Sequence, residues 1–149
     1  MIFSKEEYLN RFKEVQKSME EKGLELLISQ DTANINYLTG YDAWSFYYAQ
    51  CAIIHINHEE PILFIRAQDA GGAYLNSFLK NENIIVYEEK YIHTWPMHPY
   101  DPLIELIKKP DISESKDLAR LFKVMEEIND ELVIVPLTLT LSLVLNPTP

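Results

Sequence analysis

The chain has few residues that could join it through covalent or metal cross-links. It contains one cysteine, Cys51, among 149 residues, so neither an internal disulfide nor a cysteine zinc site can form within it. Cys51 stands in an apolar run, which predicts an inert, buried thiol. There is no His-Glu-x-x-His pattern. We therefore predict that this chain holds no metal ion and no cofactor of its own.

Basic residues are also scarce. The chain has 13 Lys and Arg against 23 Asp and Glu, which gives a formal net charge of -10. Phosphate binding needs clustered Lys and Arg, so these dispersed bases predict that nucleic acid is not a partner. Neither a Gly-x-Gly-x-x-Gly sequence nor a Walker-type loop is present, which argues against a nucleotide cofactor.

No apolar run is long enough to cross a membrane. The alternating segment 137–145 has nine residues, whereas a bilayer-spanning helix needs ~20. The start of the chain soon becomes highly charged, which is incompatible with a secretory signal. We therefore expect a cytoplasmic protein with no membrane partner.

Helical and strand patterns alternate along the chain. Ser4 and Glu7 form a capping box before an amphipathic helix that Gly23 ends. Short apolar runs predict strands at residues 24–29, 46–57, 62–65, 84–87 and 132–135. Further helices are predicted at residues 68–79, 103–108 and 113–128, and the proline-rich residues 91–102 are predicted to be irregular. The turn 57–61 should make an antiparallel hairpin of the strands around it.

This order of elements predicts an α/β fold. We expect a three-layer domain in which a mixed, central β-sheet is flanked by helices. A chain of this length with 47% hydrophobic residues fits one domain with a genuine core. We place that domain at residues 1–135. Residues 136–149 are an edge strand, a pairing arm, or a tail that starts a linker to a catalytic domain outside this chain.

Residues 34–48 contain six aromatic side chains. Gly40 follows a short apolar turn and is placed where a helix would end in a left-handed residue. From Phe46 onward the pattern predicts a strand, with Phe46 and Tyr48 on one face and Tyr47 on the other. Either one row of rings lines a binding surface, or all six rings pack in the core or at its edge.

Few polar side chains stand where they could form a functional site. Arg66 stands between a predicted strand and helix, either as a ligand clamp or paired with Asp69 or another surface acid. His93 and His98 flank Trp95 in a predicted loop, but no carboxylate stands at a metal-ligand spacing from them. Ser45 lacks a glycine elbow and Cys51 lacks an evident base, so no catalytic nucleophile is predicted.

Two motifs carry a resemblance to a known family. The pattern Tyr8-Leu9-x-Arg11-x-x-x-Val15-Gln16 and above all Asn-Ile-Asn-Tyr-Leu-Thr-Gly at residues 34–40 resemble the N-terminal domain of the creatinase, prolidase and aminopeptidase P family. The resemblance covers roughly residues 4–135. It implies a creatinase N-terminal-domain-like fold with a ribonuclease H-like motif. In that family a C-terminal pita-bread domain follows, with two divalent metal ions such as Mn, Zn or Co. The chain alone is therefore expected to be inactive.

The resemblance also implies a role. Family members form homodimers in which the N-terminal domain of one subunit closes over the active site of the other. By this resemblance the chain is the non-catalytic domain of a metal-dependent hydrolase of Xaa-Pro peptidase or creatinase type, and it caps a peptide or small-molecule substrate in trans. The implied capping residues are Tyr41, Trp44, Phe46, Tyr48 and Arg66, with a loop contribution from His93, Trp95 and His98.

One departure from the family pattern bears on the substrate. The creatinase branch has a Phe and, two positions later, an Arg that reach the neighbouring pocket; the matching residues here are Phe46 and Tyr48. Losing the bidentate carboxylate grip of Arg argues against creatine. Residues 41–47 look more like the branch with ectoine hydrolases and dimethylsulfoniopropionate lyases, where ring faces would suit a cationic or methylated group. The alternative is a stand-alone binding or interaction module with the same fold and no catalytic partner domain.

Overall fold

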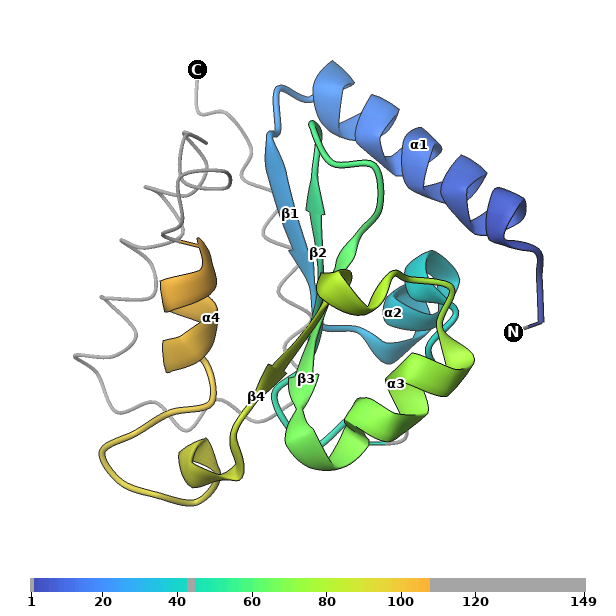
Figure 1. The fold of residues 1–149 in the computed structure, drawn as a ribbon. Helices are drawn as coiled ribbons and strands as arrows, with labels where there is room; N and C mark the ends of the chain where they lie inside the picture. Colours follow the sequence, from blue (N-terminus) through green and yellow to red (C-terminus); the bar gives the residue numbers. More distant parts are fainter. Residues whose placement is uncertain (1, 43–44, 108–149) are drawn as a thin grey trace.

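A computed structural model describes residues 2–42 and 45–107, which form a mixed four-stranded sheet with helices on both faces (Figure 1). The strands are β1 (Leu26–Ser29), β2 (Cys51–His55), β3 (Ile62–Arg66) and β4 (Ile84–Tyr87). They lie in the order β1-β2-β3-β4, and the first two pairs are antiparallel while β3 and β4 are parallel. The predicted α/β fold and the hairpin of β2 and β3 are confirmed. The helix predicted at 113–128, the strand at 132–135 and the tail 136–149 lie outside the described residues.

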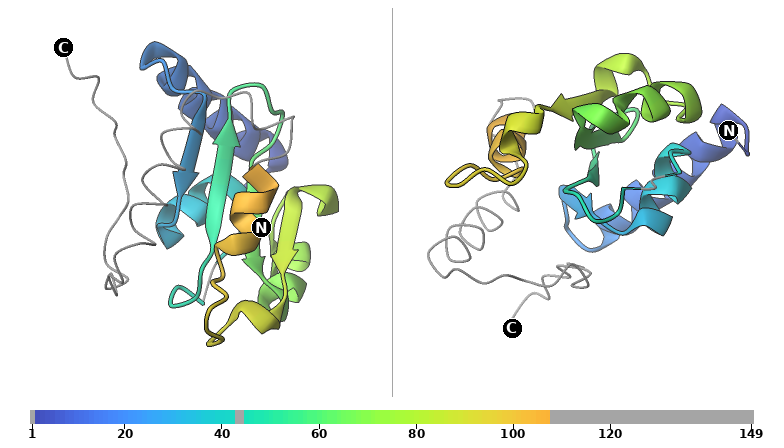
Figure 2. Two further views of the ribbon diagram at one scale, coloured as in Figure 1. Left: turned by 90° about the vertical axis from the view of Figure 1, so that its left-hand side faces the viewer. Right: turned by 90° about the horizontal axis from the view of Figure 1, so that it is seen from below.

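The helices form the two outer layers. Three of them, α1 (Lys5–Glu21), α2 (Thr32–Thr39) and α3 (Ala70–Asn76), cover one face of the sheet, and α4 (Asp101–Ile107) covers the other (Figure 2). Short 3-10 turns occur at Ala67–Asp69, Asn81–Asn83 and Glu89–Tyr91. No helix in the part of the chain that the structure describes has the length and apolarity needed to cross a membrane.

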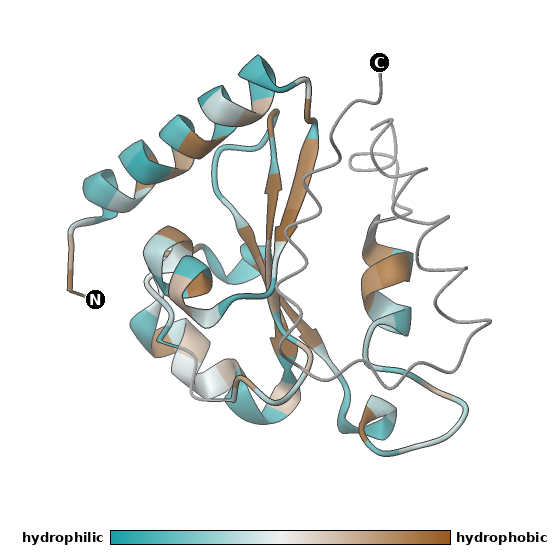
Figure 3. Ribbon diagram, turned by 180° about the vertical axis from the view of Figure 1, so that it is seen from behind, coloured by the Kyte–Doolittle hydropathy of each residue, from teal (hydrophilic) through white to brown (hydrophobic). Residues whose placement is uncertain are grey.

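Each face of the sheet has its own core. Strand side chains alternate between the faces, so Ala52 and Ile54 join the core under α1 to α3 whereas Cys51 and Ile53 join the core under α4. The strands are apolar along their length, as expected of strands covered on both faces (Figure 3). The thiol of Cys51 is fully buried, and burial raises its pKa to about 12, which confirms the prediction of an inert cysteine.

Local sequence signals set the ends of α1 and α2. The Ser4 hydroxyl accepts a hydrogen bond from the Glu7 backbone N–H at 3.2 Å and begins α1. Gly40 ends α2 with φ 74°, the left-handed conformation predicted for it. A Cβ atom at this position would approach the Tyr8 ring to 3.2 Å, so Gly40 also permits close packing of α2 on α1.

The hairpin of β2 and β3 is tied to the helical layer through Gln16 on α1. Its side-chain amide donates to three backbone carbonyls of the turn, those of His55 at 2.9 Å, Ile56 at 3.1 Å and His58 at 2.8 Å. His55 is the last residue of β2, and Ile56 and His58 follow it in the turn. The His55 carbonyl also accepts from the His58 backbone N–H at 3.1 Å, so the Gln16 amide adds to the hydrogen bonds of the turn and joins it to α1.

Two predicted elements were wrong in extent. The strand predicted at 46–57 begins only at Cys51, because β3 ends at Arg66 and the antiparallel register leaves nothing opposite residues before 49. The backbone N–H of Tyr48 instead donates to the Ser45 carbonyl at 3.0 Å, which makes a turn. The helix predicted at 68–79 is reduced to α3, which contains the weak helix formers Gly71 and Gly72.

Candidate functional site

Three connecting segments meet at one end of the sheet. Because β2 runs antiparallel to β3 and β4 runs parallel to it, the start of β2 lies beside the ends of β3 and β4. Residues 45–50, here called the aromatic turn, precede β2; residues 67–69 follow β3; and residues 88–100 follow β4. The sheet topology therefore brings together side chains that are up to about fifty residues apart in the sequence.

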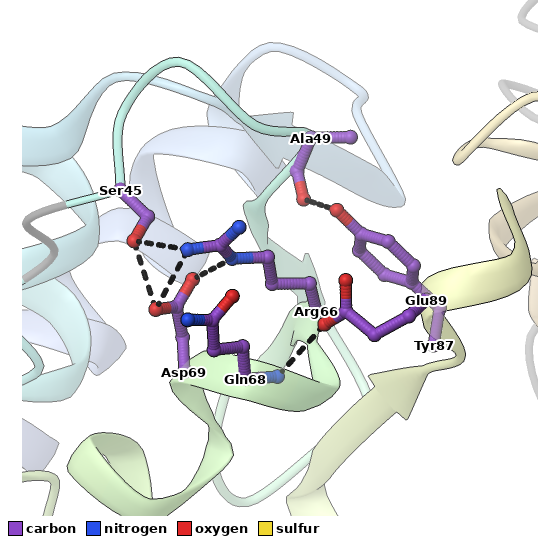
Figure 4. A network of polar contacts seen from close by, with 7 residues as sticks. All are labelled: Ser45, Ala49, Arg66, Gln68, Asp69, Tyr87 and Glu89. Atoms are coloured by element: carbon purple, nitrogen blue, oxygen red, sulfur yellow. Dashed lines mark hydrogen bonds and ion pairs between the residues drawn. The ribbon is translucent and has the colours of Figure 1, made fainter. Parts of the chain in front are cut away.

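A buried polar network anchors the aromatic turn. The Asp69 carboxylate accepts from Arg66 Nε at 2.7 Å and from the Ser45 hydroxyl at 2.8 Å, and a longer contact of 3.4 Å joins Arg66 to Ser45 (Figure 4). Ser45 and Arg66 are only 3% and 8% exposed. The Asp69 carboxylate raises the pKa of the guanidinium through its hydrogen bond. Arg66 is thus paired with Asp69, the second of the two outcomes considered for it.

Tyr48 extends this network to the next loop. Its ring lies over the Arg66 guanidinium at 3.8 Å, a cation–π contact within the ~6 Å range for such pairs. The same ring contacts Tyr47 at 4.8 Å and His93 at 6.2 Å between centroids. Tyr48 therefore connects the aromatic turn with the segment after β4.

The outer part of the site consists of exposed rings. Phe46 is 62% exposed and Tyr47 is 49% exposed, and their rings pack edge to face with centroids 5.4 Å apart. Trp95 in the loop after β4 is 82% exposed. Large apolar side chains seldom stand this open beside one another unless they contact something else.

The remaining predicted site residues have different surroundings. Tyr41 is buried, and burial together with the nearby Asp69 carboxylate raises the pKa of its hydroxyl, so it belongs to the core beneath the network. Trp44 lies outside the described residues. His98 is bound within its own loop, where its backbone N–H donates to Asp101 at 2.7 Å and its ring nitrogen accepts from the Tyr100 N–H. The structure thus brings Phe46, Tyr48 and Arg66 together with His93, whereas Tyr41 lies below them.

Four further residues belong to this site that are not among the predicted site residues: Ser45, Tyr47, Gln50 and Asp69, of which the sequence suggested only Asp69, as a partner of Arg66. Asp69 and Ser45 are 24 residues apart, and no sequence pattern links them. Tyr47 was assigned to the opposite face of a strand that does not form there. Gln50 is buried, and its amide nitrogen has no hydrogen-bond partner among residues 2–42 and 45–107, which the structure describes. The sequence signals for Gln50 are its alternation with Phe46 and Tyr48 and its position, as a polar residue, directly before an apolar run.

These groups offer a ligand exposed ring faces and a charged pair that is already neutralised. Among the described residues, no group of three or more His, Cys, Asp or Glu is arranged to hold a metal ion. The Ser45 hydroxyl donates to the Asp69 carboxylate, which is already paired with Arg66. A serine nucleophile is instead activated by an adjacent general base such as histidine. The site presents exposed rings above a hydrogen-bonded, charge-neutral pair, Arg66 and Asp69.

The chain belongs to the creatinase/prolidase N-terminal domain family, whose pattern matches residues 11–132. Among curated relatives, it is 37% identical to the ectoine hydrolase of Halomonas elongata over 105 residues, which are 70% of this chain and 26% of that protein. It is 38% identical to an uncharacterized hydrolase/peptidase of Sinorhizobium fredii over 64% of this chain and 24% of that protein. The chain therefore spans about a quarter of the length of these relatives.

Solved structures share the fold. The creatinase/prolidase N-terminal domain of an X-Pro dipeptidase from Streptococcus pyogenes superposes with a TM-score of 0.53 at 20% identity, covering 67% of this chain and 69% of that one. The dipeptidase PepE from Mycobacterium ulcerans gives a TM-score of 0.53 at 16% identity, over 69% of this chain and 26% of that one. In that dipeptidase the fold occupies one part of a longer chain.

Proposed function

We propose that this chain is the non-catalytic N-terminal domain of a metal-dependent hydrolase of Xaa-Pro peptidase or creatinase type. In this proposal it takes part in a cytoplasmic homodimer and covers the active site of the partner subunit. Phe46, Tyr48 and Arg66 form the cap, for which the resemblance also names Trp44 and Tyr41; of these, Tyr41 lies in the core below the cap. The loop bearing His93, Trp95 and His98 borders the cap.

The observation that carries this proposal is the contrast within the aromatic turn. Phe46 and Tyr47 are open to solvent, yet the turn that holds them is anchored through a buried ion pair and hydroxyl. A rigid support for exposed rings is what a preorganised contact surface needs, because little conformational freedom is then lost on binding. The similarity to hydrolases of which the matched segment covers only about a quarter supports a catalytic domain as the natural counterpart.

The metal ions of such a hydrolase do not fit this part of the protein. The described residues lack a cluster of metal-ligating side chains, and His93 and His98 have other neighbours. We propose that two divalent ions bind in the catalytic domain, and that this chain supplies side-chain contacts and excludes water from that site. Closing a site in this way strengthens the electrostatic interactions inside it.

The test uses the product of the complete reading frame that contains this chain, loaded with Mn²⁺. Turnover is measured with an Xaa-Pro dipeptide and with ectoine, for Phe46→Ala and for Tyr74→Ala, a control tyrosine on α3 that is 46% exposed. We expect Phe46→Ala to lower kcat/KM about tenfold, a loss of ~1.4 kcal/mol in the transition state, with Tyr74→Ala unchanged. Equal turnover of Phe46→Ala and the unmodified protein would exclude the capping role. A reading frame that stops at residue 149 would favour a stand-alone binding module.

A further inference from the structure

The rings of the aromatic turn are not equivalent. The Arg66 guanidinium already occupies a face of Tyr48 at 3.8 Å. Phe46 and Tyr47 are 62% and 49% exposed, and Tyr47 packs against Tyr48 from outside. A ligand that approaches this end of the sheet therefore meets Phe46 and Tyr47, while Tyr48 and Arg66 support them from behind.

The charge around these rings is not positive. Arg66 is buried and paired with Asp69, so it offers no open fork to a carboxylate. The charged residues of segments 45–50, 66–69 and 87–101 are two bases and four acids: Arg66, Lys90, Asp69, Glu88, Glu89 and Asp101. The Glu88 side chain, although it contacts Lys90, is 70% exposed. Such a surface attracts cations and repels anions.

The same molecule shows that its rings accept cations. The Arg11 guanidinium lies over the rings of Phe3, Tyr37 and Tyr8 at 4.2, 4.7 and 5.2 Å. The negative face of an aromatic ring attracts a positive charge, whether it belongs to a side chain or to a ligand. In the aromatic turn, Phe46 and Tyr47 offer similar ring surface to solvent.

We propose that Phe46 and Tyr47 are the ligand-facing residues of the cap, and that the group they bind is cationic: a quaternary ammonium, a protonated amine or a guanidinium. This inference rests on the proposed function, because it names the ligand group that the cap contacts. It assigns Tyr47 a contact role and gives Tyr48 a supporting one. It also excludes a free carboxylate as the group that the cap recognises.

The experiment is a titration of the 149-residue chain, followed through the aromatic NMR resonances. Tetramethylammonium chloride is the cationic probe, tert-butanol is the neutral probe of similar shape, and sodium acetate is the anionic probe, all at constant ionic strength. We expect tetramethylammonium to shift the resonances of Phe46 and Tyr47 and the other two probes to have little effect. Tyr37 is 49% exposed, like Tyr47, but Arg11 already lies over one face of its ring, so it serves as a matched internal control and should respond less.

Two variants sharpen the titration. Tyr47→Leu should weaken tetramethylammonium binding about two- to fivefold, because a leucine has no ring face, while Tyr47→Phe should retain it. Equal responses to acetate and tetramethylammonium, or unchanged binding in Tyr47→Leu, would overturn the inference. The titration and the turnover assay give separate answers. If Phe46→Ala lowers turnover of the complete hydrolase but the titration shows no preference for the cation, the capping role stands and the cationic ligand is rejected.

Discussion

Within residues 2–42 and 45–107, two arginines lie against tyrosine rings, Arg11 and Arg66, and they differ in how their charge is balanced. Arg66 pairs with Asp69, whose side chain is 17% exposed, and the pair is joined by a hydroxyl from a distant segment. Arg11 pairs with Glu7 one helical turn earlier, and that glutamate is 49% exposed. In one place, therefore, both members of the ion pair are largely buried, whereas in the other the carboxylate is solvated and only the Arg11 side chain, 13% exposed, is largely covered.

This difference separates two tasks. The cluster of Arg11 with Phe3 and Tyr37 holds the N-terminal segment and α2 against α1. The Arg11 side chain also donates to the Tyr37 carbonyl at 3.5 Å. The Arg66 cluster fixes a turn outside any helix or strand and so determines where the rings of that turn point. A buried network is costly to disrupt, whereas a solvated pair is replaced by water with little loss.

Removing the two carboxylates should give the largest contrast. Asp69→Ala leaves the Arg66 charge buried without a carboxylate, so we expect the free energy of unfolding to fall by about 3–5 kcal/mol. Glu7→Ala should cost no more than about 0.5 kcal/mol, because its partner stays partly hydrated and covered by rings. Urea denaturation of both variants measures the difference. Similar losses at the two positions would contradict the distinction between them.

A third carboxylate, Glu60, tests the effect of pH on such networks. Burial alone would raise its pKa, but hydrogen bonds from Lys5 at 2.6 Å, the Lys80 N–H and the Asn83 amide hold the pKa below its ordinary value of 4.5. Because the pKa of Glu60 is lowered in the folded state, the stability that its carboxylate contributes is fully present above the pKa of the unfolded state. That stability is lost as the pH falls through the pKa of the folded state.

We therefore expect the stability of the unmodified protein to decrease below about pH 4.5 more steeply than that of Glu60→Gln. At neutral pH the Gln variant should be less stable by roughly 1.5–3 kcal/mol, since it loses hydrogen bonds made by a charged group. Thermal melts between pH 3 and pH 7 compare the two proteins. Parallel pH profiles would show that Glu60 does not titrate in this way.

Removing the charge of Arg11 should lower the free energy of unfolding by a smaller amount. Arg11→Met keeps most of the apolar stem but removes the charge from the three rings, so we expect a loss of about 1 kcal/mol. Denaturant titration provides the value, with Lys13→Met on the outer face of α1 as the matched control. If both variants lose the same stability, the cation–π contacts of Arg11 contribute nothing specific.

The smallest expected effect is an unchanged or slightly raised stability. The amide nitrogen of Gln50 is buried and unpartnered among residues that the structure describes, so Gln50→Met should leave stability unchanged or raise it by about 1 kcal/mol. The measurement is again the unfolding midpoint in urea. A clear loss of stability would mean that the amide has a partner in solution, such as an ordered water molecule.

Much of the fold was readable from the sequence because it depends on local signals. Ser4 caps α1, Gly40 ends α2 in a left-handed residue, and the apolar runs at 62–65 and 84–87 are strands. The aromatic turn was misread because its residues are good strand formers, and only the end of β3 at Arg66 denies them a partner. Long-range register decided that conformation over local preference.

The site was predicted only in part for the same reason. Phe46, Tyr48 and Arg66 were recognised by type and position, and the structure places them at one end of the sheet. Asp69 had been weighed as a partner of Arg66, but its bond to Ser45 depends on how two loops meet. A strand over residues 46–48 would place Tyr47 on the face opposite Phe46 and Tyr48, so the strand pattern does not predict the exposure of Tyr47 beside Phe46.

The central claim is that Asp69 holds the aromatic turn in place through Ser45 and Arg66. The direct measurement is amide hydrogen exchange of residues 45–50 and of α1 in the unmodified chain and in Asp69→Asn. We predict that the Tyr48 amide, which donates to the Ser45 carbonyl, is protected and loses this protection in Asp69→Asn, while α1 keeps its own. Unchanged protection of Tyr48 in the variant would contradict the account.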